Sequence, residues 1–392
     1  MRVIYLGSFR FPNFDAAAAR VLNIARALRE LGHDVSFISW GGEYRKEDLC
    51  EDGVYRYDSF PYIMTNELTR PGMSKKEMFM NKMQRGEKTR RLLKDWSSPI
   101  DVIITYNNSL CRWLIPFCEK RGVKLINDIT EWYDYNELKI TDWMGYAYDM
   151  HVRQKKVKNK IVISSYLYHF YGETHNIVVP AISDASEPKW HENMGYAKAF
   201  VKPFGGITLI YAGTPAKKDA MHHVVNAVHR LNEEGRAIRF LVIGTTRESY
   251  LSRYASLLHT KDLHGNIKFQ GRVSQDVIPS FYHQADFMVL LRDQIRKSNA
   301  GFPTKFTESF TSGTPIIANL TSDLGKYLKD GETGFVVEEP TEDAVYRVLK
   351  EKVMSLNREK VESMKNNVHN IADQLDYRAY VEPLRTFMLN LK

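Results

Sequence analysis

Short apolar runs rich in β-branched residues alternate with amphipathic segments along the first half of the chain. From Val21 to Leu31 apolar residues recur every three or four positions, after Asp15, which can cap a helix, and before Gly32, which can stop one. Strands with continuous apolar character that alternate with helices predict a parallel sheet covered on both faces. The predicted strands are at 2–7, 33–40, 101–107, 123–129, 160–164 and 177–180.

The same alternation restarts after a stretch at 181–206 that contains Pro188, Pro203 and a pair of glycines. The second set of predicted strands lies at 207–212, 238–244, 266–273, 286–291, 315–319 and 333–337, with helices that include 219–234 and 304–311. We therefore expect an α/β protein with two doubly wound Rossmann-like domains that face each other across a cleft. The expected domains are 1–182 and 183–375, with a terminal helix at 376–392 that packs back on the first. Ligands of such sheets bind beyond the carboxyl ends of the strands.

Composition narrows the classes of protein. Hydrophobic residues make up 43% and charged residues 26% of the 392 residues, which excludes a disordered, collagen-like or coiled-coil chain. No apolar run approaches the roughly 18 residues of a membrane span. Three cysteines are too few for a disulfide framework and indicate a reducing, cytoplasmic setting, and their spacing does not suggest a metal site. The net charge of +8 favours acidic partners such as nucleic acid, anionic lipid or phosphorylated ligands.

Candidate chemistry concentrates after the strand that ends at Leu291. The residues Gly301, Phe302, Pro303, Thr304 and Lys305 open a helix, and free amide groups at a helix start together with a lysine form a phosphate site. Glu308 lies on the same helix and could accept hydrogen bonds from two adjacent hydroxyls, such as those of a ribose. A plain loop with solvated charges is the alternative interpretation.

A second strand-to-helix turn carries positive charge at the same predicted edge. Gly213 ends a strand, and Thr214, Lys217 and Lys218 follow before a helix. Two basic loops of this kind in one domain suit a diphosphate, although a lysine pair can also be a solubilising feature.

These residues resemble the donor domain of the retaining glycosyltransferases of family 4, which have the GT-B architecture. The resemblance is specific from about 210 to 337 and is carried by the turns above and by Gly244, Arg272 and Val273, Gly313 to Pro315, and 330–334. It implies a nucleotide-diphosphate sugar, with uridine or guanosine as the base, bound in the second domain. It also implies an acceptor in the first domain, and neither metal nor cofactor. The loop at 301–305 is similar to that of members that assemble surface polysaccharides.

Two positions depart from the family pattern. Ala300 stands where the family often has the first of two glutamates, of which Glu308 matches the second, and this leaves the identity of the sugar open. Thr214 stands in place of an arginine, so the phosphate charge must come from other residues, for which Lys305 and Arg292 are the favoured candidates.

The first domain offers candidates for the acceptor side. Gly7 ends the first predicted strand, and Arg20 on the following helix could reach the cleft. Asn127, Asp128 and Glu131 follow another strand, where carboxylates suit the recognition of sugar hydroxyls or the orientation of the acceptor. The alternative is that Asp128 caps the next helix and that Glu131 is solvated.

A basic segment at 70–94 holds nine Lys and Arg residues against two glutamates, interleaved with methionines, phenylalanine and leucines. Such a segment is typical of a helix on an anionic membrane surface, where a lipid-linked acceptor would lie, although a solvated helix face is an equal alternative. Two other functions stay open. One is a nucleotide-sugar epimerase of the same fold, and the other is a basic protein that binds membrane or nucleic acid. No nucleic-acid-binding signature is present, so nucleic acid is not expected as a partner.

Overall fold

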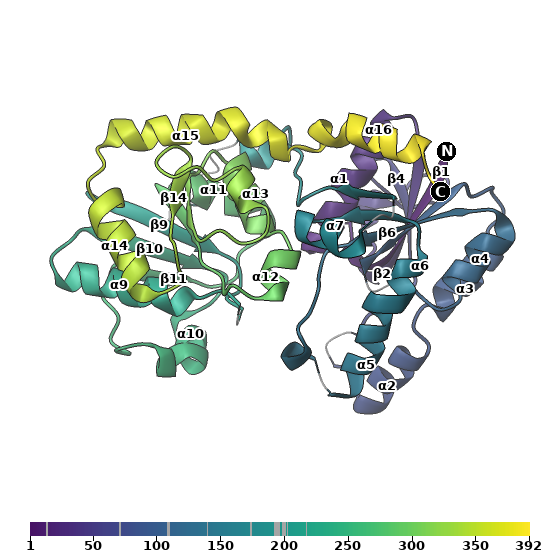
Figure 1. Cartoon of the computed structure of the whole chain (residues 1–392), viewed down its shortest axis with the longest axis horizontal. Coiled ribbons are helices and arrows are strands. Elements are labelled where there is room, and N and C mark those ends of the chain that lie inside the picture. The colour runs from purple at the N-terminus through teal and green to yellow at the C-terminus, as the bar shows by residue number, and fades with distance from the viewer. Residues whose placement is uncertain are drawn as a thin grey trace. The chain divides into compact units, whose positions relative to one another are not determined.

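The computed structural model describes residues 1–12, 15–69, 72–107, 110–138, 140–172, 175–191, 197, 201, 203–216 and 218–392. The chain divides into two compact units (Figure 1). Unit 1 comprises Met1–Ile182 together with Tyr377–Lys392, and unit 2 comprises Ser183–Asp376.

Unit 1 is built on an eight-stranded sheet with the strand order β3-β4-β2-β1-β5-β6-β7-β8, in which only β3 and β4 pair antiparallel. Its strands are β1 (Arg2–Phe11), β2 (Asp34–Gly42), β3 (Arg56–Tyr57), β4 (Phe60–Met64), β5 (Val102–Tyr106), β6 (Lys124–Ile129), β7 (Asn159–Val162) and β8 (His175–Val178). The six predicted strands of this half are confirmed, whereas β3 and β4 were not expected. The prediction that strand one ends at Gly7 is wrong. A register shift between Gly7 and Arg10 lets β1 continue beside β2 as far as Phe11.

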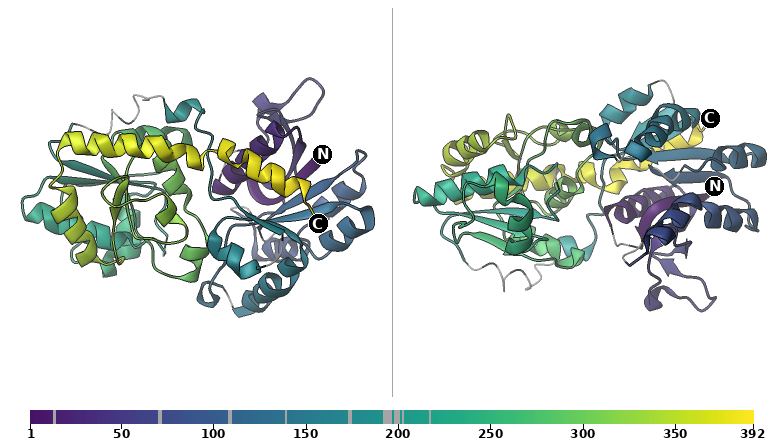
Figure 2. Two further views of the ribbon diagram at one scale, coloured as in Figure 1. Left: turned by 45° about the horizontal axis from the view of Figure 1, so that its top comes forward. Right: turned by 90° about the horizontal axis from the view of Figure 1, so that it is seen from below.

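Helices cover this sheet. They are α1 (Ala16–Glu30), α2 (Lys75–Met83), α3 (Glu87–Lys94), α4 (Leu114–Arg121), α5 (Ile140–Tyr148), α6 (Gln154–Lys156), α7 (Ser165–Tyr171) and α16 (Val381–Leu389). The Asp15 side chain accepts a hydrogen bond from the Ala18 N–H, so the predicted cap of α1 is confirmed. Helix α16 packs against α1 and β8, and Figure 2 shows it against unit 1 in two views.

Unit 2 has a six-stranded, fully parallel sheet with the strand order β11-β10-β9-β12-β13-β14. Its strands are β9 (Ile207–Ala212), β10 (Ile238–Ile243), β11 (Ile267–Gln270), β12 (Phe287–Leu290), β13 (Ile316–Ala318) and β14 (Gly334–Val336). The main helices are α9 (Met221–Glu233), α10 (Arg247–Tyr254), α11 (Ile278–His283), α12 (Arg296–Ala300), α13 (Thr304–Thr311), α14 (Glu342–Arg347) and α15 (Arg358–Ala372). All six predicted strands are present, and α13 has the predicted bounds.

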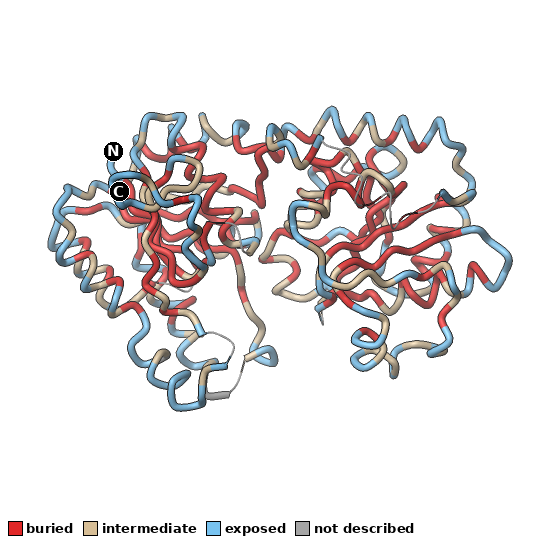
Figure 3. Tube along the Cα trace, turned by 180° about the vertical axis from the view of Figure 1, so that it is seen from behind, coloured by how far each residue is buried: buried red, intermediate tan, exposed pale blue. Residues whose placement is uncertain are grey.

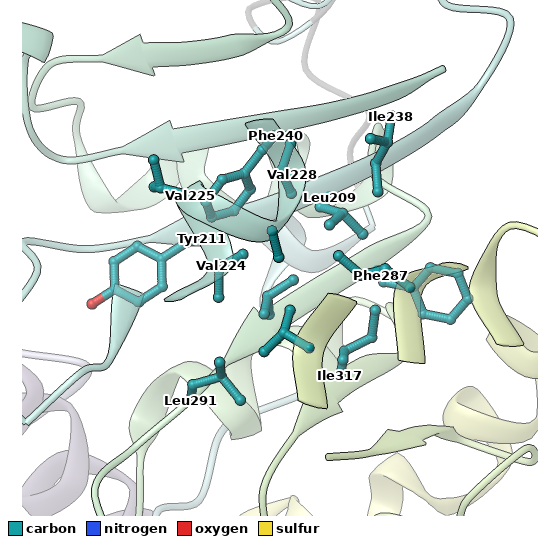
Figure 4. Packing of buried hydrophobic residues seen from close by; sticks show 14 of the residues in the cluster. Leu209, Tyr211, Val224, Val225, Val228, Ile238, Phe240, Phe287, Leu291 and Ile317 are labelled. Atoms are coloured by element: carbon teal, nitrogen blue, oxygen red, sulfur yellow. The ribbon is translucent and has the colours of Figure 1, made fainter. Parts of the chain in front are cut away.

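The core of each unit lies between its sheet and its helices. In unit 2, Leu209 and Phe240 on neighbouring strands pack with Val224 and Val228 of α9 (Figure 4). In both units most strand residues are buried, while the helices expose their outer faces (Figure 3). Within the described residues, no helix is both long and apolar enough to cross a bilayer.

The strand order of unit 2 locates its ligand edge. The chain moves outward from β9 through β10 to β11, and then returns to the other side of β9 to form β12, β13 and β14. The order therefore reverses between β9 and β12. In doubly wound sheets, ligands bind at this switch point, outside the carboxyl ends of the two strands.

Candidate active site

The switch point of unit 2 brings together the two turns that the sequence singles out. The turn after β9 begins at Gly213, and the segment after β12 begins with Leu291 and Arg292. Backbone hydrogen bonds join the two turns, from the Ala220 N–H to the Leu291 carbonyl and from the Asp293 N–H to the Lys218 carbonyl. The two turns therefore form one connected structure at the ligand edge.

Close backbone packing explains the glycines at this edge. Gly213 has a φ of +128°, and a Cβ on it would lie 2.5 Å from the Cε atom of Lys305. Gly244, at the end of β10, has a φ of +106°, and a Cβ on it would lie 2.7 Å from the Gly213 carbonyl carbon. Both positions need glycine for the backbone angle and for the space. Lys305 occupies the room that Gly213 leaves.

A cluster of buried charges lies beneath this edge. The Asp219 carboxylate accepts a hydrogen bond from the Tyr211 hydroxyl at 2.7 Å. Its Oδ1 is 3.5 Å from the Arg292 Nε, and its Oδ2 is 4.0 Å from the Lys305 Nζ. Asp219 and Arg292 are 3% and 4% exposed, whereas the Lys305 side chain keeps 19% of its surface open to solvent. The cluster thus contains two cations for one central carboxylate.

Burial and mutual charge set the pKa values of the cluster. Burial lowers the pKa of Lys305, and the neighbouring Arg292 adds to this effect, while Asp219 and Glu308 oppose it. Burial also lowers the pKa of Arg292. For Asp219, burial alone would raise the pKa, but Lys305 and Arg292 outweigh it and hold the carboxyl below its usual value. Asp219 is therefore ionised and stabilises the charged forms of both cations.

Helix α13 carries Lys305 and Glu308 to this edge. Pro303 is its N-cap residue and offers no side-chain cap. The Phe306 N–H donates to the Pro303 carbonyl, which leaves the N–H groups of Thr304 and Lys305 for another acceptor. Partial burial raises the pKa of the Glu308 carboxyl, an effect that Lys305 and Lys189 partly offset. The Tyr282 hydroxyl lies near Glu308 without meeting the geometry of a hydrogen bond. A lysine, a helix start and a half-buried carboxyl thus lie within two turns of helix.

The other predicted donor residues fall into two groups. Thr214 and Arg272 are exposed, and Gly301 and Val273 are half-buried. The Thr214 hydroxyl lies 3.5 Å from the Gly244 carbonyl, and Arg272 and Val273 follow β11, two strands away from β9.

Phe302 is a correction to the predicted donor residues. Its ring is buried against Phe306 and Tyr327, so it is a packing residue and not a surface for ligand. The segment before it is not the plain loop of the alternative interpretation, because it contains helix α12. Lys218 is half-buried beside Asp219, and Lys217 lies outside the described residues.

Asp219 is the residue that sequence reasoning missed. The sequence shows it only as the start of a predicted helix. Its position directly after two lysines in a strand-to-helix turn is the signal that could have identified it.

Two candidates of unit 1 are structural residues. Asp128 is fully buried in β6, where it receives hydrogen bonds from the Arg20 Nε and Nη2 atoms and from the Tyr5 hydroxyl. The remaining Arg20 nitrogen, Nη1, donates to the carbonyl oxygens of Val179 and Pro180. Arg20 therefore does not reach outward, and Asp128 neither orients an acceptor nor caps a helix. The pair ties α1 to the sheet.

The remaining candidates of unit 1 differ in exposure. Asn127 is completely buried, with no hydrogen-bond partner for its side chain among the described residues. Gly7 lies inside β1. Glu131 is half-buried after β6, at the carboxyl end of the sheet, and its carboxylate accepts a hydrogen bond from the Tyr133 hydroxyl.

Two α/β units with mainly parallel sheets are the architecture of GT-B proteins. Residues 197–370 match the sequence profile of the family described as Glycosyl transferases group 1. The matched segment lies wholly within unit 2 and contains the cluster around Asp219. The second unit thus matches the group 1 profile over most of its length, and the chain as a whole has the GT-B architecture.

Solved structures confirm the fold. HepE from Anabaena, in complex with UDP-glucose, has a TM-score of 0.68 at 13% sequence identity and covers 100% of both chains. Sucrose-phosphate synthase from Thermosynechococcus elongatus has a TM-score of 0.71 at 14% identity and covers 100% of this chain and 98% of its own. WaaG, a glycosyltransferase involved in lipopolysaccharide biosynthesis, has a TM-score of 0.63 at 14% identity and covers 99% of this chain and 100% of its own. No curated protein sequence matches the chain.

Proposed function

We propose that the protein is a retaining glycosyltransferase that moves a sugar from a nucleotide-diphosphate sugar to a glycan or lipid-linked acceptor. The observation that carries this proposal is the pair of cations, Lys305 and Arg292, held at the switch point of the group 1 domain. A diphosphate is the ligand that matches two neighbouring cations and an open helix start. One solved structure of the similar protein HepE contains UDP-glucose, and another structure of HepE contains UDP. A uridine or guanosine nucleotide sugar is therefore the proposed donor.

The proposed mechanism relies on stabilisation of the leaving group. The bond between the sugar and the diphosphate breaks on the same face on which the acceptor hydroxyl attacks, and the departing phosphate accepts the hydroxyl proton. Negative charge grows on the phosphate in the transition state, and Lys305, Arg292 and the first amides of α13 stabilise it. Lys218 adds charge from the neighbouring turn. These groups supply the charge that a metal ion supplies in other transferases, so we propose no metal and no cofactor.

A thermal-shift panel of nucleoside diphosphates and their sugars tests the donor. A ligand at 100 times its Kd should stabilise the protein by about 2.7 kcal/mol. Uridine or guanosine diphosphates should raise the melting temperature, and the monophosphates should raise it less. Absence of a shift with every nucleotide would contradict the proposed donor. Incubation of the positive donor without acceptor then separates a transferase from an epimerase, because only the epimerase converts the sugar while it remains on the nucleotide.

We further propose that unit 1 contacts the cytoplasmic face of an anionic membrane, as a peripheral protein, and takes its acceptor there. Helix α2 projects from unit 1 (Figure 1), with Phe79 61% and Met83 70% exposed. Lys75 and Lys76 on the same helix are exposed, as are Lys88, Arg91 and Lys94 on α3. The exposed apolar side chains suit the apolar boundary of a bilayer, and the exposed cations of α2 and α3 suit its anionic headgroups. Arg70, at the start of the predicted basic segment, lies outside the described residues.

Flotation with liposomes tests this part separately. The protein should float with vesicles that contain anionic lipid and stay in the soluble fraction with neutral vesicles. Absence of flotation with both kinds of vesicle would contradict the membrane proposal and leave the donor proposal intact.

A further inference from the structure

Asp219 has more contacts at the switch point than the donor proposal uses. Its Oδ2 receives hydrogen bonds from the Tyr211 hydroxyl at 2.7 Å and from the Ala216 N–H at 3.2 Å. The first bond joins it to β9 and the second to the turn after β9. Through Arg292 it also contacts the segment after β12, with which residue 219 forms a β-bridge.

The position of Asp219 makes it a poor ligand for the donor itself. Asp219 and Arg292 are both almost completely buried, whereas the Lys305 side chain retains an open surface, so Lys305 is the group that a donor can touch and Arg292 adds its charge from beneath. A carboxylate would also repel a diphosphate. The Asp219 carboxylate instead forms ion pairs with both cations, Arg292 and Lys305, beneath the ligand edge.

We propose that Asp219 is the positioning residue of the donor site, which holds the Lys305 ammonium charged and keeps both this ammonium and the Arg292 guanidinium in place for the diphosphate. This inference rests on the proposed function. The hydrogen bonds from Tyr211 and Ala216 keep the carboxylate between the two cations, and Gly213 leaves the room in which the lysine chain lies. The role also follows from the energetics of burial, because a buried cation without a counter-charge loses its proton or leaves the interior.

The charged groups around Lys305 set the direction of the expected effect. Asp219 and Glu308 favour its protonated form, and Arg292 and burial disfavour it. The Tyr211 ring lies 5.1 Å from its Nζ, and Lys218 acts on Asp219 from the adjacent turn. Without the Asp219 charge, burial and Arg292 still lower the pKa of Lys305, and only Glu308 raises it. The pKa of Lys305 should therefore fall. An opposite charge at this distance typically accounts for about one pH unit or more.

The test is an Asp219→Asn variant in which the reactivity of Lys305 is measured against pH. Acetic anhydride acylates only the neutral amine, and mass spectrometry of the peptide that contains Lys305 gives the pH of half-maximal reactivity. We expect this midpoint to fall by at least about one pH unit in Asp219→Asn. Asp293→Asn is the matched control, because it removes an exposed carboxylate from the same edge that has no ion pair with Lys305. That control should keep the midpoint of the wild-type chain.

Nucleotide binding gives a second readout. As the pH rises and Lys305 loses its proton, the affinity for a nucleoside diphosphate should decline. In Asp219→Asn this decline should begin about one pH unit lower than in the wild-type chain. The additional change Lys305→Arg should remove this pH dependence, because arginine stays charged. A loss of affinity that is equal at every pH would show a merely structural role and overturn the proposal.

If Asp219→Asn does not fold, the labelling is repeated with Asp219→Glu. Glutamate keeps the negative charge, so the midpoint of Lys305 reactivity should stay near that of the wild-type chain. A fall in this midpoint as large as the one expected for Asp219→Asn would overturn the proposal.

The two proposals fail in different ways. Labelling needs no nucleotide, so an unchanged midpoint in Asp219→Asn overturns the role of Asp219 whether or not the chain binds a donor. A lowered midpoint in a chain that binds no nucleoside diphosphate overturns the proposed donor and supports the role of Asp219 in holding Lys305 charged.

Discussion

Replacement of Gly213 with alanine is a direct test of how the edge of unit 2 is built. An alanine at a φ of +128° adopts a backbone region that only glycine populates readily. Such strain costs about 1–3 kcal/mol. The new methyl group would also lie 2.5 Å from the Lys305 Cε, so the lysine chain must move. The substitution therefore changes stability and the position of one cation together.

Both effects have expected magnitudes. For a unit of this size, about 1–3 kcal/mol lowers the melting temperature by roughly 2–12 °C. Loss of one charged contact to a phosphate costs about 1.5–3 kcal/mol, which raises the Kd for a nucleoside diphosphate by about tenfold to a hundredfold. Differential scanning fluorimetry gives the first quantity. Isothermal titration with the diphosphate that stabilises the wild-type chain most gives the second.

The control variant Gly235→Ala separates the effect of backbone strain from the effect of moving the Lys305 side chain. Gly235 has a φ of +78°, and a Cβ on it would meet no atom within 4 Å. This variant should lose about 1–2 kcal/mol of stability through the backbone alone and keep its nucleotide affinity. If Gly213→Ala also kept the wild-type affinity while it lost stability, Lys305 would not be a phosphate ligand and the assigned edge would be wrong.

Three further outcomes follow from the structure. Lys305→Ala and Lys218→Ala should each lower kcat by about two to three orders of magnitude while the chain still folds, and kinetics like those of the wild-type chain in both would refute the phosphate assignment. Arg20→Ala should lower the free energy of unfolding by about 3–5 kcal/mol, because it leaves the buried Asp128 carboxylate without its partner, and a loss below about 1 kcal/mol in a denaturant titration would contradict this structural role. Phe79→Asp on α2 should reduce flotation with anionic liposomes while leaving nucleotide binding as it is, and unchanged flotation would exclude α2 from the membrane contact.

Local signals were sufficient to predict part of unit 2. The bounds of α13 follow from Pro303, which suits a helix start, and from Gly313 shortly after its end. Apart from β3 and β4, the strands of both sheets follow from short apolar runs, since buried parallel strands need little else. These features depend on residues that are neighbours in the sequence.

Features that depend on distant residues were not predictable in the same way. Asp128 stands at the end of a strand, where a carboxylate often contacts ligand, but its partner Arg20 lies 108 positions away. The role of Asp219 likewise depends on Arg292 and Lys305, which come from a different turn and helix. The extension of β1 to Phe11 depends on its pairing with β2. In each case the deciding contact forms only when the sheet assembles.

The return of the chain to unit 1 has a consequence for the order of synthesis. Unit 2 is continuous in sequence, whereas unit 1 needs Tyr377–Lys392 to complete its core. Leu384, Phe387 and Met388 are buried there, and the Phe387 ring stacks on His175 with centroids 4.6 Å apart. Domains usually fold in the order in which the ribosome makes them. In this chain the first residues of unit 1 are made before unit 2, and its last residues are made after unit 2. A nascent chain can therefore complete unit 2 while the sheet of unit 1 still exposes the apolar surface that α16 later covers.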